Sequence, residues 1–218
     1  MEGPHHDRER RERWEEGYVA VRRQKWLRRA RIRRHLRGPT DSRVVEIGSG
    51  DGLNLEVLAE LGFRRVLGLE YSLDLIARGS SRRVAAGDAH ALPFATGGID
   101  LVLVDSVLHH LTDYAAAARE LSRVLRPAGR LVYFEPRPSL ARRLLDRVTF
   151  SAWGRRLPYL RARHQTLLEE IDLYGHWLDH HREMEGHLVA AGLTRRFRWR
   201  GPIGLFAGFD KPRSGARA

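Results

Sequence analysis

Between residues 43 and 135 the chain alternates short apolar segments with segments whose apolar residues recur at helical spacing. The segments predicted to be strands are Arg43–Ile47, Arg65–Glu70, Arg83–Gly87, Ile99–Asp105 and Arg130–Glu135. Short apolar strands that alternate with helices are typical of a parallel sheet covered on both faces. Because such crossovers are right-handed, the pattern predicts a doubly wound, Rossmann-like α/β fold.

The segments between and after these strands complete the expected architecture. The predicted helices are Leu53–Leu61, Leu73–Arg78 and Asp113–Leu125, with "RPAG" expected to end the last of them. Residues 139–191 are predicted to be helical, with a loop near "WGRRLPYL". The segments Thr194–Arg200 and Ile203–Asp210 alternate around "GP" and predict an antiparallel hairpin.

The ends of the chain differ from the middle in charge. The formal net charge of +12 divides into +7 for residues 1–43, −3 for 44–136 and +8 for 137–218. Residues 1–13 are predicted to be disordered, and the apolar residues from Trp14 to Leu36 predict an amphipathic helix with an arginine-rich face. Basic flanks of this kind favour nucleic acid only weakly, because charged faces are often simply solvated.

Composition excludes several classes of chemistry. The chain has no cysteine, which excludes disulfides, thiolate metal sites and cysteine nucleophiles. No apolar run reaches the roughly 18 residues of a membrane helix, and the N-terminus lacks an apolar signal core. These features predict a cytoplasmic protein with no membrane span.

The stretch "VVEIGSGDG" places three glycines at alternate positions after the first predicted strand. Gly48, Gly50 and Gly52 allow a sharp turn and let a ligand approach the backbone. The turn lacks the Lys–Ser/Thr pair of a triphosphate loop, and its third glycine comes one position too early for a dinucleotide loop. Because Glu46 and Asp51 would repel phosphate, the turn favours a positively charged nucleoside.

Two further acids follow the next two strands. Glu70 ends the second strand, where a carboxylate can accept hydrogen bonds from both hydroxyls of a ribose. Asp88 follows the third strand in "AAGDAHALPF" and can accept a hydrogen bond from an exocyclic amine, while the backbone N–H of Ala89 can meet a ring nitrogen. Acids at the ends of three successive strands therefore predict a nucleoside site.

From Arg43 to Pro136 the sequence resembles the class I S-adenosylmethionine-dependent methyltransferases. The resemblance rests on "VVEIGSGDG", "VLGLEYS", "GDAHALPF", "IDLVLVDSVLHHL" and "ELSRVLRPAGRLVYFEP", in the order and spacing of that family. It implies a seven-stranded, mostly parallel sheet with an antiparallel last strand. It also implies S-adenosylmethionine as cofactor, with S-adenosylhomocysteine as product.

The same resemblance assigns residues to the cofactor, and the patterns along the rest of the chain predict how it divides into parts. The residues that would contact the cofactor are Glu46, Gly48, Gly50, Gly52, Glu70, Tyr71, Asp88, Ala89, Asp105 and Ser106. Tyr71 would pack near the adenine, and Asp105 and Ser106 would lie by the methionine moiety and the acceptor entrance. The implied parts are a basic tail and helix over 1–42, a methyltransferase domain over 43–210 with a helical lid or substrate insert over 139–191, and a flexible tail over 211–218.

Histidines supply the candidates for acceptor chemistry. His109 and His110 follow the fourth strand, where an imidazole has a pKa suited to deprotonating an acceptor, and His110 is the preferred base. His176 and His180 have the spacing of two metal ligands, but no H-E-x-x-H motif is present, so no metal is predicted. Tyr174, Trp177 and His180, together with His110, are instead expected to line an acceptor pocket.

The predicted function is methyl transfer to an oxygen, nitrogen or carbon nucleophile of a small molecule. The segment after the fifth strand resembles the lid of small-molecule methyltransferases, and "DSVLHH" stands where nucleic-acid amine methyltransferases carry an N-P-P-Y-like tetrad. Two alternatives stay open: an RNA- or protein-directed methyltransferase that docks through the basic flanks, and a non-catalytic module that only binds the cofactor. Nothing in the sequence predicts the oligomeric state.

Overall fold

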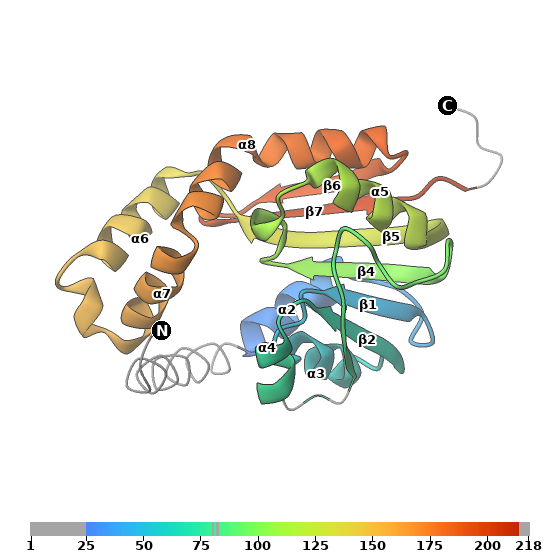
Figure 1. Cartoon of the computed structure of the whole chain (residues 1–218), viewed down its shortest axis with the longest axis horizontal. Helices are drawn as coiled ribbons and strands as arrows, with labels where there is room; N and C mark the ends of the chain where they lie inside the picture. The colour runs from blue at the N-terminus through green and yellow to red at the C-terminus, as the bar shows by residue number, and fades with distance from the viewer. Residues whose placement is uncertain (1–24, 80, 82, 214–218) are drawn as a thin grey trace.

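A computed structural model describes residues 25–79, 81 and 83–213, and it contains one seven-stranded sheet (Figure 1). The strands are β1 (Arg43–Ile47), β2 (Arg65–Glu70), β3 (Val84–Ala86), β4 (Ile99–Asp105), β5 (Leu125–Pro136), β6 (Thr194–Arg200) and β7 (Gly204–Asp210). Their order across the sheet is β3-β2-β1-β4-β5-β7-β6. Because β7 pairs antiparallel with both neighbours and the other pairs are parallel, the predicted fold class and the hairpin are confirmed.

Helices cover both faces of the sheet. They are α2 (Lys25–His35), α3 (Leu53–Glu60), α4 (Leu73–Arg78), α5 (Tyr114–Val124), α6 (Leu140–Phe150), α7 (Pro158–Glu169) and α8 (Ile171–Ala190). Alternate residues of the central strands supply the two cores. Leu103 and Phe134 pack with α2 and α3, whereas Val104 and Tyr133 pack with α5 and α8. This alternation is the period of a strand buried on both faces.

Three helices begin at side chains that accept a hydrogen bond from the first turn. Ser72 caps α4, Asp113 caps α5 and Ser139 caps α6. Each cap satisfies a backbone N–H that has no partner inside the helix. The starts predicted for α4 and α5, Leu73 and Asp113, lie within one residue of the observed starts, Leu73 and Tyr114.

The prediction that "RPAG" separates α5 from a strand beginning at Arg130 is wrong. The strand β5 already begins at Leu125, which pairs with Ile99 of β4. The register then shifts, and pairing resumes between Leu101 and Arg130. Ala128 has a φ of 61°, so the segment forms an irregularity within the strand rather than a loop before it.

The segment predicted as one helical insert over 139–191 has two different parts. Figure 1 shows α6 and α7 projecting from one end of the sheet, with a short 3-10 turn at Gly154–Arg156 between them. The helix α8 instead returns along the sheet, and its Met184 and Leu188 are fully buried in the core. The insert is therefore α6 with α7, which we call the arm (residues 140–169).

Two other predictions concern the chain ends and membranes. The described part of the N-terminal helix is α2, whereas Trp14 and the tail over 1–13 lie outside the described residues. The last five residues of the predicted C-terminal tail also lie outside them. In the described part of the chain, every helix is too short or too polar to cross a membrane.

Candidate cofactor and acceptor site

Four predicted acids lie at one edge of the sheet. Glu46 is in β1, Glu70 and Asp105 are the last residues of β2 and β4, and Asp88 comes two residues after β3. Because β3, β2, β1 and β4 are adjacent and parallel, their carboxyl ends meet at this edge. In open α/β sheets this edge is where ligands bind.

The glycine turn after β1 has the backbone geometry that its sequence predicts. Gly48, Gly50 and Gly52 all have positive φ, of 67°, 53° and 85°. A β-carbon at Gly48 would lie 2.2 Å from Cγ2 of Val107, so only glycine fits between the turn and the end of β4. A β-carbon at Gly50 would meet no atom within 4 Å, which leaves open space above the turn.

Glu70 fixes the turn against the end of β2. One of its oxygens accepts a hydrogen bond from the Gly50 N–H at 2.8 Å, and the other accepts from the Ser72 N–H at 2.8 Å. The side chain is 8% exposed, whereas the adjacent Tyr71 is 79% exposed. Glu70 therefore shapes the turn in addition to its predicted ribose role, and Tyr71 is free to cover a ligand.

Asp88 occupies the corresponding position after β3. Its Oδ1 accepts hydrogen bonds from the His90 backbone N–H at 2.8 Å and from the His90 ring at 2.7 Å. The bonds to His90 lower the pKa of Asp88, which is therefore ionised at neutral pH. Ala89 is partly buried against the core.

A buried polar network joins Glu46 to Asp105. The Asn54 amide donates to Glu46 Oε1 at 2.6 Å and to Asp105 Oδ2 at 3.0 Å. Burial raises the pKa of Glu46 well above its ordinary value, and its Oε2 has no hydrogen-bond partner within the described part of the chain. A ligand with a donor group at this point would satisfy that oxygen.

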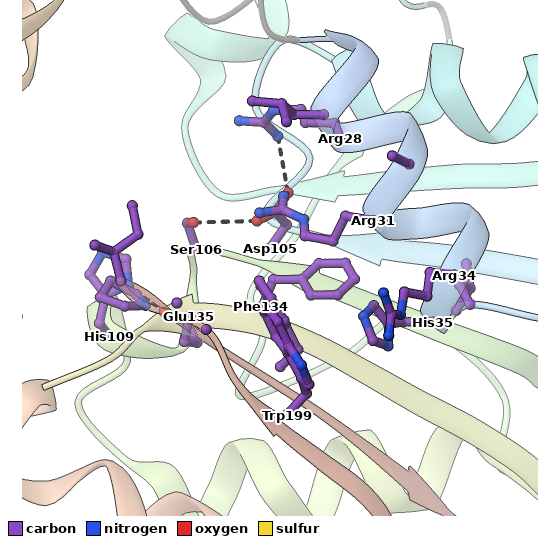
Figure 2. Close-up of a pocket in the computed structure, with 18 of the residues that line it drawn as sticks. Arg28, Arg31, Arg34, His35, Asp105, Ser106, His109, Phe134, Glu135 and Trp199 are labelled. Atoms are coloured by element: carbon purple, nitrogen blue, oxygen red, sulfur yellow. Dashed lines mark hydrogen bonds and ion pairs between the residues drawn. The ribbon is translucent and has the colours of Figure 1, made fainter. Parts of the chain in front are cut away.

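Two arginines of α2 reach the same network. Arg28 lies 3.1 Å and Arg31 2.5 Å from Asp105 Oδ2 (Figure 2). Although burial alone would raise the pKa of Asp105, these arginines lower it, so the carboxylate is ionised. The neighbouring Ser106 has a φ of 61°, a backbone conformation that is uncommon for non-glycine residues and is enriched at functional sites.

A cavity of about 1600 Å³ opens beside Asp105 and Ser106. Figure 2 shows α2 on one side of it and the ends of β4 and β5 on the other. Aromatic side chains line one part: Trp199 stacks on Phe206 at 4.8 Å between ring centroids, and Phe134 meets Phe206 edge-on at 5.1 Å. The arginines that line the cavity are Arg28, Arg31, Arg33, Arg34, Arg37, Arg142 and Arg163.

His109 is a buried cation that lines the cavity on the side away from His35 (Figure 2). Its Nδ1 lies 2.7 Å from Glu135 Oε2, and its Nε2 lies 3.7 Å from Glu170 Oε2. Although burial alone would lower it, the two carboxylates raise the pKa of His109 to about 9. His109 therefore carries a proton at neutral pH and is unsuited to remove one.

His110 has the opposite electrostatic environment. It lines the cavity with 36% of its side chain exposed, and its Nε2 lies 3.7 Å from Glu170 Oε2. Burial and the charge of His109 lower the pKa of His110 below its ordinary value. The two histidines therefore differ in charge and in exposure: His109 is buried and protonated, whereas His110 is neutral and partly exposed in the cavity. Their adjacent positions in the sequence give no sign of this difference.

Of the three residues on α8 that were predicted to line the acceptor pocket, one lines the cavity and two do not. Tyr174 lines the cavity, as expected from the sequence. Trp177 is fully buried, its Nε1 donates to the Pro136 carbonyl at 2.9 Å, and it packs in the core, so its predicted place in the pocket is wrong. His180 is wrong for the opposite reason, since it lies exposed on α8 and stacks on His176 at 4.3 Å.

The charge on His109 predicts a specific pH dependence of stability. A folded-state pKa of about 9 exceeds the unfolded value near 6.5, so the stabilisation is complete below about pH 6.5 and disappears as the pH rises through 9. We expect the free energy of unfolding to fall over this window by an amount on the order of 3 kcal/mol. Urea unfolding of the wild type and of His109→Gln measures this, and equal slopes in the two proteins would contradict it.

Comparison with known proteins identifies the central region. Residues 45–133 match the family described as methyltransferase domain. The demethylmenaquinone methyltransferase of Mycolicibacterium gilvum is 39% identical over 99 residues, which are 44% of this chain and 42% of that protein. The chain spans less than half the length of the curated relatives that it matches.

Solved structures extend the likeness of fold over more of the chain. A Haloferax volcanii methyltransferase in complex with the Trm112 methyltransferase activator has a TM-score of 0.63, is 15% identical, and covers 94% of this chain and 96% of its own. Residues 45–133 thus match a methyltransferase domain, and the chain as a whole has the fold of this solved structure. The geranyl diphosphate C-methyltransferase of Streptomyces coelicolor A3(2) shares this fold, with a TM-score of 0.60 and 14% identity over 87% of this chain and 80% of its own.

Sequence reasoning missed four side chains of the candidate site. Glu135 is the second-to-last residue of β5, in "YFEP", but nothing in that stretch shows that its side chain contacts His109. Arg28 and Arg31 belong to a helix whose arginines are expected to be solvated, and Glu170 is the residue between α7 and α8. Each of these side chains contacts a partner more than twenty residues away in the sequence. The spacing of neighbouring residues therefore cannot predict these contacts.

Proposed function

We propose that the protein transfers the methyl group of S-adenosylmethionine to a small-molecule acceptor in the cavity beside Asp105. The observation that carries the proposal is the pairing of two features at one sheet edge. Acids lie at or near the carboxyl ends of four adjacent strands around an open glycine turn, and a neutral histidine lines the adjoining cavity. The first feature suits a cationic nucleoside, and the second suits an acceptor that must lose a proton.

The residues at the turn fit S-adenosylmethionine. The buried Glu46 Oε2 lacks a donor, and the open space above Gly50 allows a ligand to approach the backbone. Glu46 and the turn would hold the methionine part, and Glu70 would hold the ribose hydroxyls. Asp88 and Ala89 would bind the adenine, with Tyr71 packed near it. When bound, S-adenosylmethionine supplies a methyl group activated by a positively charged sulfur.

The chain's own residues would then orient and deprotonate the acceptor. His110 lines the cavity as a neutral base, and Glu170, which lies 3.7 Å from its Nε2, would stabilise the imidazolium formed when His110 takes a proton. His109 stays protonated and holds the carboxylates of Glu135 and Glu170 in place. The cavity walls would align the acceptor with the methyl group.

The aromatic lining favours an acceptor with a planar ring. Stacked and edge-on rings at Phe134, Trp199 and Phe206 offer contacts to another aromatic ring. A relative that covers part of this chain bears the name demethylmenaquinone methyltransferase, so a demethylated quinol is the first acceptor to assay. Methyl transfer should be measured across a panel of quinols, phenols and amines, and absence of turnover despite tight cofactor binding would contradict the proposal.

Asp88 provides a test of cofactor binding that needs no acceptor. Replacing Asp88 with alanine removes an ionised acceptor for the adenine amine, so the dissociation constant for S-adenosylhomocysteine should rise on the order of tenfold. Calorimetric titration measures this value. Asp113→Ala, which removes an exposed helix cap elsewhere, is the matched control and should bind as the wild type does. Equal affinities for all three proteins would remove Asp88 from the site.

The alternative of a nucleic-acid acceptor makes a different prediction. Binding through basic flanks would weaken steeply as salt increases, because it releases counterions from phosphates. Filter binding of RNA at several salt concentrations distinguishes this alternative from the small-molecule proposal.

A further inference from the structure

The arm and the first residues after it expose an unusual amount of apolar surface. Of the seventeen large apolar side chains that are exposed in the described residues, ten lie between positions 140 and 173. They are Leu140, Leu144, Val148, Phe150, Trp153, Leu157, Tyr159, Leu168, Ile171 and Leu173. Exposed apolar side chains concentrated in one segment in this way are a mark of an interaction site.

The apolar residues of α6 form a stripe on the side away from α7. Leu140, Leu144 and Val148 recur every fourth residue and are 82%, 63% and 41% exposed. The other side of α6 is fixed to α7, because Arg163 lies 2.7 Å from Asp146 and donates to the buried Thr149 at 3.0 Å. The leucines of α6 are therefore exposed while the helix itself is held firmly against α7.

The same surface is strongly basic. Between positions 140 and 163 there are seven arginines and one acid, and that acid, Asp146, is already paired with Arg163. Arg143 and Arg147 are exposed beside the leucine stripe. At the tip, the Arg156 guanidinium lies 4.8 Å from the ring centre of Trp153, which is 77% exposed. Arginine beside exposed leucine and tryptophan is the composition of helices that lie in a membrane interface.

The base of the arm is continuous with the cavity. Arg142, Leu167 and Glu170 line the cavity, while Leu144 and Leu168 nearby are exposed to solvent. An apolar acceptor molecule released from a surface bound to the arm would therefore lie next to the cavity. This position gives the apolar surface a relation to the acceptor site that a patch elsewhere would lack.

Other occupants fit this surface less well. A symmetric contact between two copies would bring the same arginines opposite one another, with Asp146 already neutralised. A nucleic acid would pair with the arginines but would leave the leucine stripe without apolar contacts. A bilayer with anionic headgroups satisfies both components, because the acyl chains accept the leucines and the headgroups accept the arginines.

We propose that the arm is a docking surface for anionic lipid bilayers, which it binds peripherally through Leu140, Leu144 and Trp153 together with its arginines. The test is co-sedimentation of the full chain with vesicles made of equal parts phosphatidylcholine and phosphatidylglycerol, compared with phosphatidylcholine alone. The protein should sediment with the mixed vesicles, and its binding should weaken as salt increases.

Paired substitutions separate the arm from general electrostatic attraction. Combining Leu140→Ser, Leu144→Ser and Trp153→Ser should lower the vesicle partition coefficient on the order of a hundredfold, while leaving the net charge unchanged. Val189→Ser, at an exposed valine on α8, is the matched apolar control and should bind as the wild type does. Arg143→Glu with Arg147→Glu should weaken binding to the mixed vesicles more than Arg64→Glu together with Arg119→Glu, two exposed arginines outside the arm.

Several outcomes would overturn the proposal. Wild-type protein that stays in solution with the mixed vesicles would do so, as would full vesicle binding by the triple serine variant. A dimer in sedimentation velocity that the triple variant dissociates, without vesicle binding, would instead assign the surface to a second copy. Because the assay measures binding without methyl transfer, its result does not depend on the proposed enzymatic activity.

Discussion

Replacing Glu135 with alanine should lower the free energy of unfolding by about 3–5 kcal/mol. Glu135 is 3% exposed, and its Oε1 accepts hydrogen bonds from the backbone N–H groups of Val107 and Leu108 at 2.8 and 2.7 Å. Its other oxygen holds the protonated ring of His109. Alanine would leave one buried and one partly buried backbone donor without an acceptor. It would also leave a buried imidazolium without its closest counter-charge, which is the costly way to break such a pair.

The control for this prediction is a carboxylate with similar partners but more solvent. Glu120 accepts from the Leu92 backbone N–H at 2.7 Å and pairs with Arg123, yet 19% of its side chain is exposed. Glu120→Ala should therefore cost about 1 kcal/mol. Urea unfolding at pH 7 compares the two variants. A loss at Glu135 no larger than the loss at Glu120 would show that the His109 pair contributes little.

A second variant separates charge from hydrogen bonding at Glu135. Glu135→Gln keeps an oxygen for the two backbone donors but removes the negative charge beside His109. It should therefore retain more stability than alanine does, and it should reduce the decline in stability between pH 6.5 and 9, because the pKa of His109 would fall. These two readouts together show whether Glu135 acts as a charge or only as an acceptor.

The fold was predictable where local pattern and tertiary packing agree. The strands of the central sheet are apolar because they are buried on both faces, and the glycine turn needs positive φ whatever else surrounds it. Prediction failed at "RPAG", where Pro127 and Gly129 suggested a loop between elements. Leu125 nevertheless pairs with Ile99, so a tertiary contact determined where the strand begins.

The site was predictable for its acids and much less so for its histidines. Acids at strand ends point to one edge once a parallel sheet is expected, which is why the four acids at that edge come together. Helical spacing placed Tyr174 and Trp177 on one face of α8, but it could not show where that face changes from cavity to core. The distinction between His109 and His110 depends on Glu135 and Glu170, whose positions follow only from the packed structure.

Replacing His110 with glutamine should lower kcat for an acceptor that must lose a proton by about 10²–10⁴-fold, the usual contribution of a general base. His110 lines the cavity, and its lowered pKa keeps the imidazole neutral and able to accept a proton near neutral pH. Glutamine retains polarity but cannot act as a base. The dissociation constant for S-adenosylhomocysteine should stay close to the wild-type value, since His110 has no assigned contact with the cofactor.

The matched control for His110 is His180, an exposed histidine outside the cavity, and His180→Gln should leave kcat unchanged. The dependence of kcat on pH gives a second readout, because the wild-type rate should fall as His110 becomes protonated below neutral pH, while His110→Gln should lose that limb.

Metal binding is an alternative role for the same side chains, and activity measured with a chelator distinguishes it from general base catalysis. His109, His110 and Glu170 offer ligand atoms within 4.8 Å of one another, a spacing that a metal ion could bridge. If His110 acts as a base, EDTA should leave kcat unchanged, and the residual activity of His110→Gln should rise with pH as hydroxide or ionised acceptor replaces the missing base. A rate abolished by EDTA and restored by Zn²⁺ would instead make these residues metal ligands, because a coordinated imidazole has no lone pair left to accept a proton.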